Sequence, residues 1–351
     1  MQNNPTIYAH QIVNKIIFAI VIIKVHINQN SHMLYRRHLR IKVLQSLYSW
    51  YSGGTNDIVI GEKQLLQSID RLHDLFLYQL SFLVEIKRFA EIRIEENKRK
   101  FYPTEEDLNP NLKFVQNKVL IGIEQNNEFI LSEGRLKVNW TDQSDMVLKF
   151  YNLIKSKQFF LKYMASEDNS IEADKKVLIK IIDVLLPDFE ILKSIYEEKS
   201  VYFSDGYDLV TLLLIKFIEN FNSNFSSSTS LPGIYKPAIN GKNEDRDFVR
   251  NLYKFVLRND SEIDEELKLR TKNWEFERIP LMDVILLKMA IIELQKMDTV
   301  PVKVTLNEYI ELAKYFSTAN SKIFVNGVLD RLIREYKEEG KINKTGRGLV
   351  D

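Results

Sequence analysis

A long amphipathic pattern without helix-breaking residues is the feature that most constrains how this chain folds. Residues 62–100 contain neither glycine nor proline. Within them apolar side chains recur every three or four residues, at Leu65, Ile69, Leu72, Phe76, Leu80, Leu83, Ile86 and Ala90. This spacing places the apolar side chains on one face of an α-helix. The stretch therefore predicts one very long helix that packs through that face.

Similar patterns cover most of the remaining chain. The sequence has only 12 glycines and 8 prolines, and 45% of its 351 residues are hydrophobic, which is enough for a substantial core. Further helices are predicted at about residues 39–51, 142–164, 171–185, 188–198, 208–220, 244–259, 261–272, 280–295, 304–317 and 319–339. Gly53 and Gly54 end the first of these. The predicted fold class is all-α, with short helices in a loop-rich segment at residues 111–140.

Small and turn-forming residues cluster between two groups of predicted helices. Residues 223–242 contain the run Ser226–Ser230, followed by Pro232, Gly233 and Pro237. This composition predicts a surface linker. The predicted organisation is an N-terminal helical subdomain at residues 33–222, the linker at 223–242, a C-terminal helical subdomain at 243–340, and a disordered tail at 341–351.

The first 32 residues do not fit this organisation. The apolar stretch Ile12–Ile27 is interrupted by Asn14, Lys15, Lys24 and His26, so it lacks the run of about 18–20 apolar residues that a membrane span needs. No small-residue cleavage site of a signal peptide follows Ile27. We expect translation to start at Met33, which would make residues 1–32 a non-native or disordered upstream extension.

Composition excludes several kinds of chemistry. The chain has no cysteine, which excludes disulfides, thiolate nucleophiles and cysteine-ligated metal sites and fits a reducing cytoplasm. No two of its five histidines have helical ligand spacing, so no metal site is predicted. Gly241-Lys242 lacks the spacing and the following Ser or Thr of a phosphate loop, and no G-x-G-x-x-G motif occurs. We therefore expect no cofactor and no enzymatic activity.

Arginines gather where the first predicted helix begins. Arg36, Arg37, Arg40 and Lys42 lie within seven residues, and Tyr48 follows two turns beyond Arg40. Guanidinium groups bind phosphates and stack on bases, and a tyrosine ring offers a further stacking face. The net charge of +1 provides no general attraction for nucleic acid, so RNA binding would depend on this local patch. The alternative is a solvated basic helix end without a ligand.

Two distant stretches together resemble the NusB family of bacterial transcription antitermination factors. The first runs from Arg36 to Trp50. The second begins at Met297, continues through a predicted helix at residues 304–316, and ends in Phe324-Val325-Asn326-Gly327-Val328-Leu329-Asp330. The resemblance implies an all-helical, NusB-like bundle of two packed helical subdomains. Residues of about 60–240 show little motif identity and constitute a long insertion in the middle.

The resemblance also implies partners and site residues. NusB proteins bind the boxA element of nascent RNA together with NusE, a ribosomal small-subunit protein, and help RNA polymerase to pass terminators, notably in ribosomal RNA operons. The implied RNA contacts are Arg36, Arg37, Arg40, Tyr48, Ser321, Lys322 and Phe324, and the implied NusE contact is Asp283. Phe324 has an alternative role in core packing.

Other residues of the second stretch are better explained by structure. Leu312, Phe316, Val325, Val328 and Leu332 have helical spacing and are predicted core residues, and Gly327 is predicted to permit close helix packing.

Two alternatives to the RNA-binding factor remain. One is a helical adaptor that keeps the fold and binds only protein. The other is an enzyme, because some RNA cytosine methyltransferases carry a NusB-like domain, but these enzymes need a cysteine that this chain lacks. A homodimer of the free protein, a cytoplasmic location and the absence of membrane association are further expectations.

Overall fold

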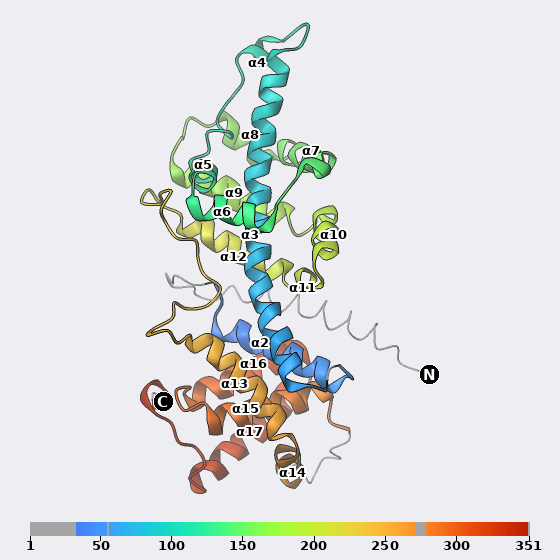
Figure 1. Ribbon diagram of the computed structural model, residues 1–351, viewed down its shortest axis with the longest axis vertical. Helices are drawn as coiled ribbons and strands as arrows, with labels where there is room; N and C mark the ends of the chain where they lie inside the picture. Colours follow the sequence, from blue (N-terminus) through green and yellow to red (C-terminus); the bar gives the residue numbers. More distant parts are fainter. Residues whose placement is uncertain (1–32, 55, 271–277, 350–351) are drawn as a thin grey trace, which may run out of the picture. The chain divides into compact units, whose positions relative to one another are not determined.

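The computed structural model describes residues 33–54, 56–270 and 278–349 (Figure 1). Within these residues no β-strand occurs, and a single isolated bridge joins Ile239 to Lys242. The prediction of an all-α fold is therefore confirmed. None of the helices in this part of the chain has the length and apolar content needed to cross a lipid bilayer. The prediction for residues 1–32 lies outside the described residues.

The described chain divides into two compact units. Unit 1 contains residues 33–69 and 234–349, and unit 2 contains residues 70–233. The helices of unit 1 are α2 (Arg36–Tyr51), the first part of α3 (Ile58–Lys98), α13 (Glu244–Arg258), α14 (Asp260–Arg270), α15 (Leu281–Lys296), α16 (Val302–Phe316), α17 (Ser321–Glu338) and the 3-10 helix η3 (Gly346–Leu349). Unit 2 contains the rest of α3, α4 (Glu105–Leu108), α5 (Lys118–Glu124), α6 (Asn127–Leu136), η1 (Thr141–Gln143), α7 (Ser144–Lys155), α8 (Gln158–Ala165), α9 (Ile171–Leu185), α10 (Glu190–Lys199), α11 (Val201–Ser204) and α12 (Tyr207–Asn220).

This division differs from the predicted subdomain at residues 33–222, because residues 33–69 belong with the C-terminal helices. Helix α2 packs on α13 and α15 and buries Leu39, Val43 and Leu47. Near the start of α3, Glu62 pairs with Arg250 of α13 at 2.6 Å. Helices far apart in sequence are thus joined by packing that the order of residues along the chain does not reveal.

Helix α15 is the centre of unit 1. Every residue from Met282 to Leu294 is buried, and the helix contacts α2, α13, α16 and α17. A helix that is apolar on all sides is stable only when other elements surround it. Its buried ionisable residues Asp283, Lys288 and Glu293 each bond to a side chain of another helix. Because buried charges need partners, these three contacts fix which helices can surround α15.

Aromatic side chains form much of the core of unit 2. The ring of Phe82 on α3 lies 5.3 Å from Trp140 and 5.0 Å from Phe150, measured between centroids. On the same helix, Lys87 and Arg88 both pair with Glu124 of α5. The loop-rich segment at residues 111–140 contains the short helices α5 and α6, as predicted.

One predicted helix proves to be two. The pattern at residues 142–164 is divided into α7 and α8, because the backbone of Lys157 is extended. No glycine or proline marks this break, so local composition carries no signal for it. In contrast, the predicted helices at 171–185 and 244–259 match α9 and α13 within one residue.

The predicted linker at residues 223–242 is more ordered than its composition indicates. The side-chain amide of Asn126, the N-cap of α6, donates to the carbonyls of Ser226 and Thr229. Asn240 and Gly241 both have positive φ and lie in a two-residue turn, which explains why an Asn-Gly pair stands there. The boundary between the two units falls after Gly233, inside this segment.

The tail also differs from its prediction as a disordered segment. Residues 344–348 lie against the loop that follows α15 and form hydrogen bonds with it. The composition of the tail is typical of disorder, but these bonds hold Lys344 and Thr345 against the loop.

Candidate nucleic-acid interface

Helix α2 carries the arginines that gather at its start in the sequence. The ring nitrogen of His38 accepts a hydrogen bond from the backbone N–H of Tyr35 at 3.2 Å, which satisfies the N-cap of α2. His38 interrupts the arginine run in sequence, and this bond gives it a role at the helix start.

Two of these arginines are partly exposed and held by carboxylates of unit 1. Arg36 donates through Nε to Asp245 at 2.8 Å, and its guanidinium lies 4.4 Å from the centre of the Phe248 ring. Arg37 forms a fork with Glu308, with bonds of 2.8 and 2.7 Å. Their side chains are 24% and 28% exposed. The hydrogen bonds to Glu308 raise the pKa of Arg37, and the fork orients its guanidinium at the surface.

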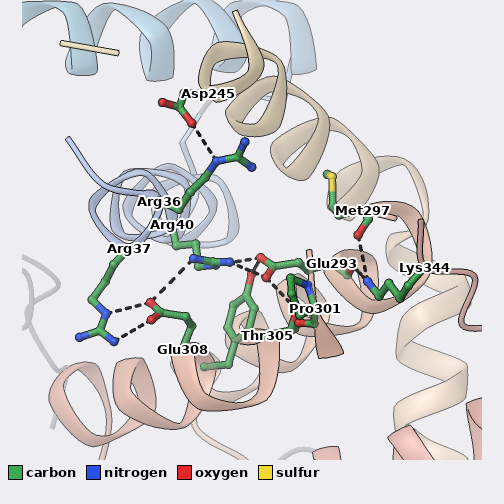
Figure 2. Close-up of polar contacts among 11 residues, drawn as sticks. Arg36, Arg37, Arg40, Asp245, Glu293, Met297, Pro301, Thr305, Glu308 and Lys344 are labelled. Carbon is green, nitrogen blue, oxygen red and sulfur yellow. Dashed lines mark hydrogen bonds and ion pairs between the residues drawn. The ribbon is translucent and has the colours of Figure 1, made fainter. Parts of the chain in front are cut away.

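Arg40 does not belong to this exposed group. Its side chain is 2% exposed and forks onto the carboxylate of Glu293 at 2.8 and 2.6 Å (Figure 2). Thr305 and Tyr309 also donate to that carboxylate, at 2.9 and 3.1 Å. Burial alone would raise the pKa of Glu293, but the Arg40 guanidinium and these bonds hold it below its usual value. The structure therefore gives Arg40 a role inside unit 1, where the sequence predicted an RNA contact.

A groove forms where α15 and α17 begin. Its volume is about 870 Å³, and its lining residues are Arg270, Arg278, Ile279, Pro280, Asp283, Thr318, Asn320, Ser321, Ile323, Phe324, Gly327, Val328 and Arg331. Three of the candidate residues from the sequence, Asp283, Ser321 and Phe324, meet here. Phe324 is half-buried, so its ring combines packing with exposure to the groove.

Asp283 is enclosed at the base of this groove. It is 2% exposed, and one carboxylate oxygen accepts a 2.6 Å hydrogen bond from the Ser321 hydroxyl. The other oxygen is buried without a hydrogen-bond partner in the described part of the chain. Burial raises the pKa of Asp283. The Asp283 carboxylate therefore positions Ser321. The sequence resemblance implied that Asp283 contacts a partner protein, but its side chain is not exposed at the surface.

The remaining candidates lie apart from the groove floor. Lys322 is exposed on the first turn of α17, and Tyr48 is half-buried on α2. Among the described residues, the groove lining includes neither Tyr48 nor the arginines of α2. Unit 1 thus presents two separate candidate surfaces, one on α2 and one at the start of α17.

Residues that the sequence did not point to complete both surfaces. Arg270, Arg278 and Arg331 line the groove, and Glu308 and Asp245 hold the two exposed arginines of α2. Arg331 follows Phe324 by seven residues, so helical periodicity places both on one face of α17. This spacing could have been recognised in the sequence. The carboxylates that pair with the arginines of α2 lie on other helices, and no sequence pattern pointed to them.

The second sequence stretch contains both core and groove residues. Leu312, Phe316, Val325 and Leu332 are buried as predicted. Val328 is half-buried and lines the groove. The prediction for Gly327 was wrong, because an added Cβ there would meet nothing within 4 Å.

Fold and site define unit 1 as an all-α bundle built around a central helix that is buried from Met282 to Leu294. Comparison with known sequences gives the family: the NusB family model matches residues 215–334. The curated transcription antitermination protein NusB of Salinibacter ruber is 45% identical over 105 residues, which are 30% of this chain and 66% of that protein. That of Chloroherpeton thalassium is 42% identical over 106 residues, 30% of this chain and 50% of the relative.

A third relative, the transcription antitermination protein NusB of Clostridium botulinum, is 38% identical over 96 residues, covering 27% of this chain and 67% of that protein. The chain belongs to the NusB family. No solved structure matches it. The alignments span about two thirds and one half of the length of the first two relatives. The family match contains α13 to α16, the groove and most of α17, whereas α2 precedes it.

Proposed function

We propose that this protein is a non-catalytic transcription antitermination factor that binds boxA-type RNA in nascent transcripts together with NusE, within an RNA polymerase antitermination complex. All three relatives carry the name transcription antitermination protein. The observation that carries the proposal is the groove at the start of α17, where Ser321, Phe324 and three arginines line one concavity inside the family match.

The groove has the chemistry that single-stranded RNA requires. An RNA base stacks on the half-buried ring of Phe324, which is worth about 1–3 kcal/mol per stacked base. Arg331 and Arg278 line the same groove and supply guanidinium groups for the phosphates, and Arg331 is 55% exposed although it also pairs with Glu335. Ser321 is held by Asp283, and Lys322 is exposed next to it. Stacking and phosphate contact are thus available within one groove.

The arginines of α2 supply a second contact in this proposal. The bonds to Glu308 engage two of the five guanidinium N–H groups of Arg37, and its side chain is partly exposed. Ion pairs at a surface contribute only about 0–1 kcal/mol. A phosphate can therefore bind the remaining N–H groups of Arg37, or displace Glu308, without a large loss of stability. Arg36 and Arg37 therefore stay in the proposed RNA surface, with Tyr48 farther along α2, and Arg40 becomes the residue that anchors the helix.

NusE is proposed to dock beside the start of α15. Because Asp283 is enclosed, its carboxylate acts there through Ser321. The apolar side chains next to it provide the surface for a protein, since Leu281 is 39% and Ile323 76% exposed. A protein bound here would cover one edge of the groove. The groove and NusE would then both contact the same RNA.

A binding titration with matched variants tests the RNA site. We would titrate boxA-like and scrambled RNA, with and without NusE, at several salt concentrations. Arg331→Gln should weaken RNA binding and reduce the salt slope by about one unit, the change for one lost phosphate contact. Arg334→Gln is the control, because Arg334 lies on the same helix outside the groove lining. Equal binding by both variants would contradict the proposed site.

The same titration separates the adaptor from the RNA-binding factor. An adaptor would bind NusE with no dependence on RNA sequence or on Arg331. An RNA-binding factor should prefer boxA-like over scrambled RNA, and NusE should increase that preference because the two partners share one surface.

A further inference from the structure

The C-terminal end of α15 is completed by a residue from the tail. The last four carbonyls of any α-helix have no partner inside the helix. Here the ammonium group of Lys344 donates to the carbonyl of Glu293 at 3.0 Å and to that of Met297 at 2.9 Å (Figure 2). A lysine at this end also interacts favourably with the helix dipole. Lys344 therefore caps α15 from a distance of about fifty residues in sequence.

The residues after Lys344 follow the loop between α15 and α16. The backbone N–H of Thr345 donates to the carbonyl of Asp298 at 3.0 Å, and its hydroxyl donates to the Asp298 carboxylate at 3.0 Å. A Cβ on Gly348 would overlap the same carbonyl of Asp298, so only glycine fits without a shift. We call residues 344–348 the strap. Its backbone lies close against the loop at Thr345 and Gly348.

The strap and the arginine helix meet at one residue. The backbone carbonyl of Glu293 receives Lys344, and the side-chain carboxylate of Glu293 receives Arg40. Figure 2 shows Glu293 between these two cations, with Thr305 on the same carboxylate. Arg40 lies one turn after Arg36 and Arg37 on α2, so its position fixes theirs. Three bonded segments, namely the strap, α2 and α16, therefore converge on the end of α15.

We propose that the strap is a positioning element that locks the end of α15 and, through Glu293 and Arg40, holds the arginine face of α2 in place. The strap lies outside the family match and outside both candidate RNA surfaces. This inference goes beyond the proposed function, because it concerns how α2 is held whether or not RNA binds there.

Hydrogen exchange of the full chain without RNA tests the proposal. Lys344→Met keeps the length of the side chain and removes its donors. The amides of Val300, which bonds to Met297, and of Leu39 to Val43 in α2 should then exchange roughly tenfold faster or more, as expected when a charge-assisted hydrogen bond is lost. Lys337→Met, on the exposed side of α17, is the matched control and should change neither group of amides.

Two further variants keep the test decisive. Lys344→Arg retains cationic donors and should restore slow exchange in both groups. Thr345→Val removes only the hydroxyl bond to Asp298, so it tests the strap with less risk to folding. If the Val300 amide exchanges at the parent rate in Lys344→Met, the strap does not lock the end of α15. If Val300 exchanges faster but the α2 amides do not, the strap does not hold α2 in place. Neither result depends on RNA, so failure of the proposed function would be seen separately in the titration.

Discussion

Replacing Arg40 by methionine is the sharpest test of how unit 1 is held together. Methionine fills a similar volume but cannot donate to Glu293, whose side chain is fully buried and whose carboxylate receives the Arg40 fork at 2.8 and 2.6 Å. Removing one partner of a buried pair costs about 3–5 kcal/mol, because the remaining charge is left without compensation. We expect a loss of that size in the free energy of unfolding at pH 7.

Arg37→Met is the matched control on the same helix. Arg37 forms an equally short fork with Glu308, but the two side chains are 28% and 16% exposed. Water replaces the lost bonds at such a site, so the expected cost is about 1 kcal/mol or less. The two variants lose the same kind of interaction, and the difference between them measures the effect of burial.

Acid should reduce the penalty for Arg40→Met. In the parent protein, Arg40 keeps the pKa of Glu293 low, so this pair contributes stability that is lost as pH falls. Without Arg40, burial raises the pKa of Glu293 above its unfolded value of about 4.3, and the folded state takes up a proton first. The variant therefore gains stability as pH falls toward 4.3, and its difference from the parent becomes smaller.

Urea unfolding followed by circular dichroism measures these differences, with a separate transition allowed for each unit. With a urea dependence of about 1–3 kcal/mol per molar, the Arg40→Met midpoint should fall by about 1 M or more. The reasoning that burial makes this pair essential would be refuted by either of two results. One is that Arg40→Met loses no more unfolding free energy than Arg37→Met, and the other is that its loss stays the same in acid.

Three further predictions concern individual residues. In Asp283→Asn, the cost of ionising a buried carboxyl with a raised pKa disappears, so the variant should gain stability relative to the parent as pH rises above about 3.9, measured by urea unfolding across pH. Gly327→Ala should raise the thermal midpoint by stabilising helix α17 by up to about 1 kcal/mol, and should lower boxA affinity severalfold because its methyl group enters the proposed RNA groove. Asn126→Ala should cost about 1–2 kcal/mol by removing a helix cap. Limited proteolysis should then cut faster at Ser226–Ser230 than in the parent, because the bonds from Asn126 to this segment are lost.

The sequence alone determined the helices and the family resemblance. Apolar spacing is a local property, so it predicted α9 and α13 within one residue and the long helix α3 in outline. The motif around Phe324 is a continuous run of residues, so together with the stretch from Arg36 to Trp50 it pointed to the NusB family, and the family match includes it. The helical spacing of Phe324 and Arg331 would also have revealed one side of the groove.

Only the tertiary structure decided which charged residues are exposed. Arg36, Arg37 and Arg40 look alike in sequence, yet Glu293 of a distant helix encloses Arg40 while Arg37 stays at the surface. Packing against Ser321 likewise removes Asp283 from solvent, which its sequence position does not show. In the tail, Lys344 donates to a carbonyl of α15, a partner about fifty residues away in the chain. Burial and ion pairing depend on residues that are far apart in the chain, and local pattern carries no information about such partners.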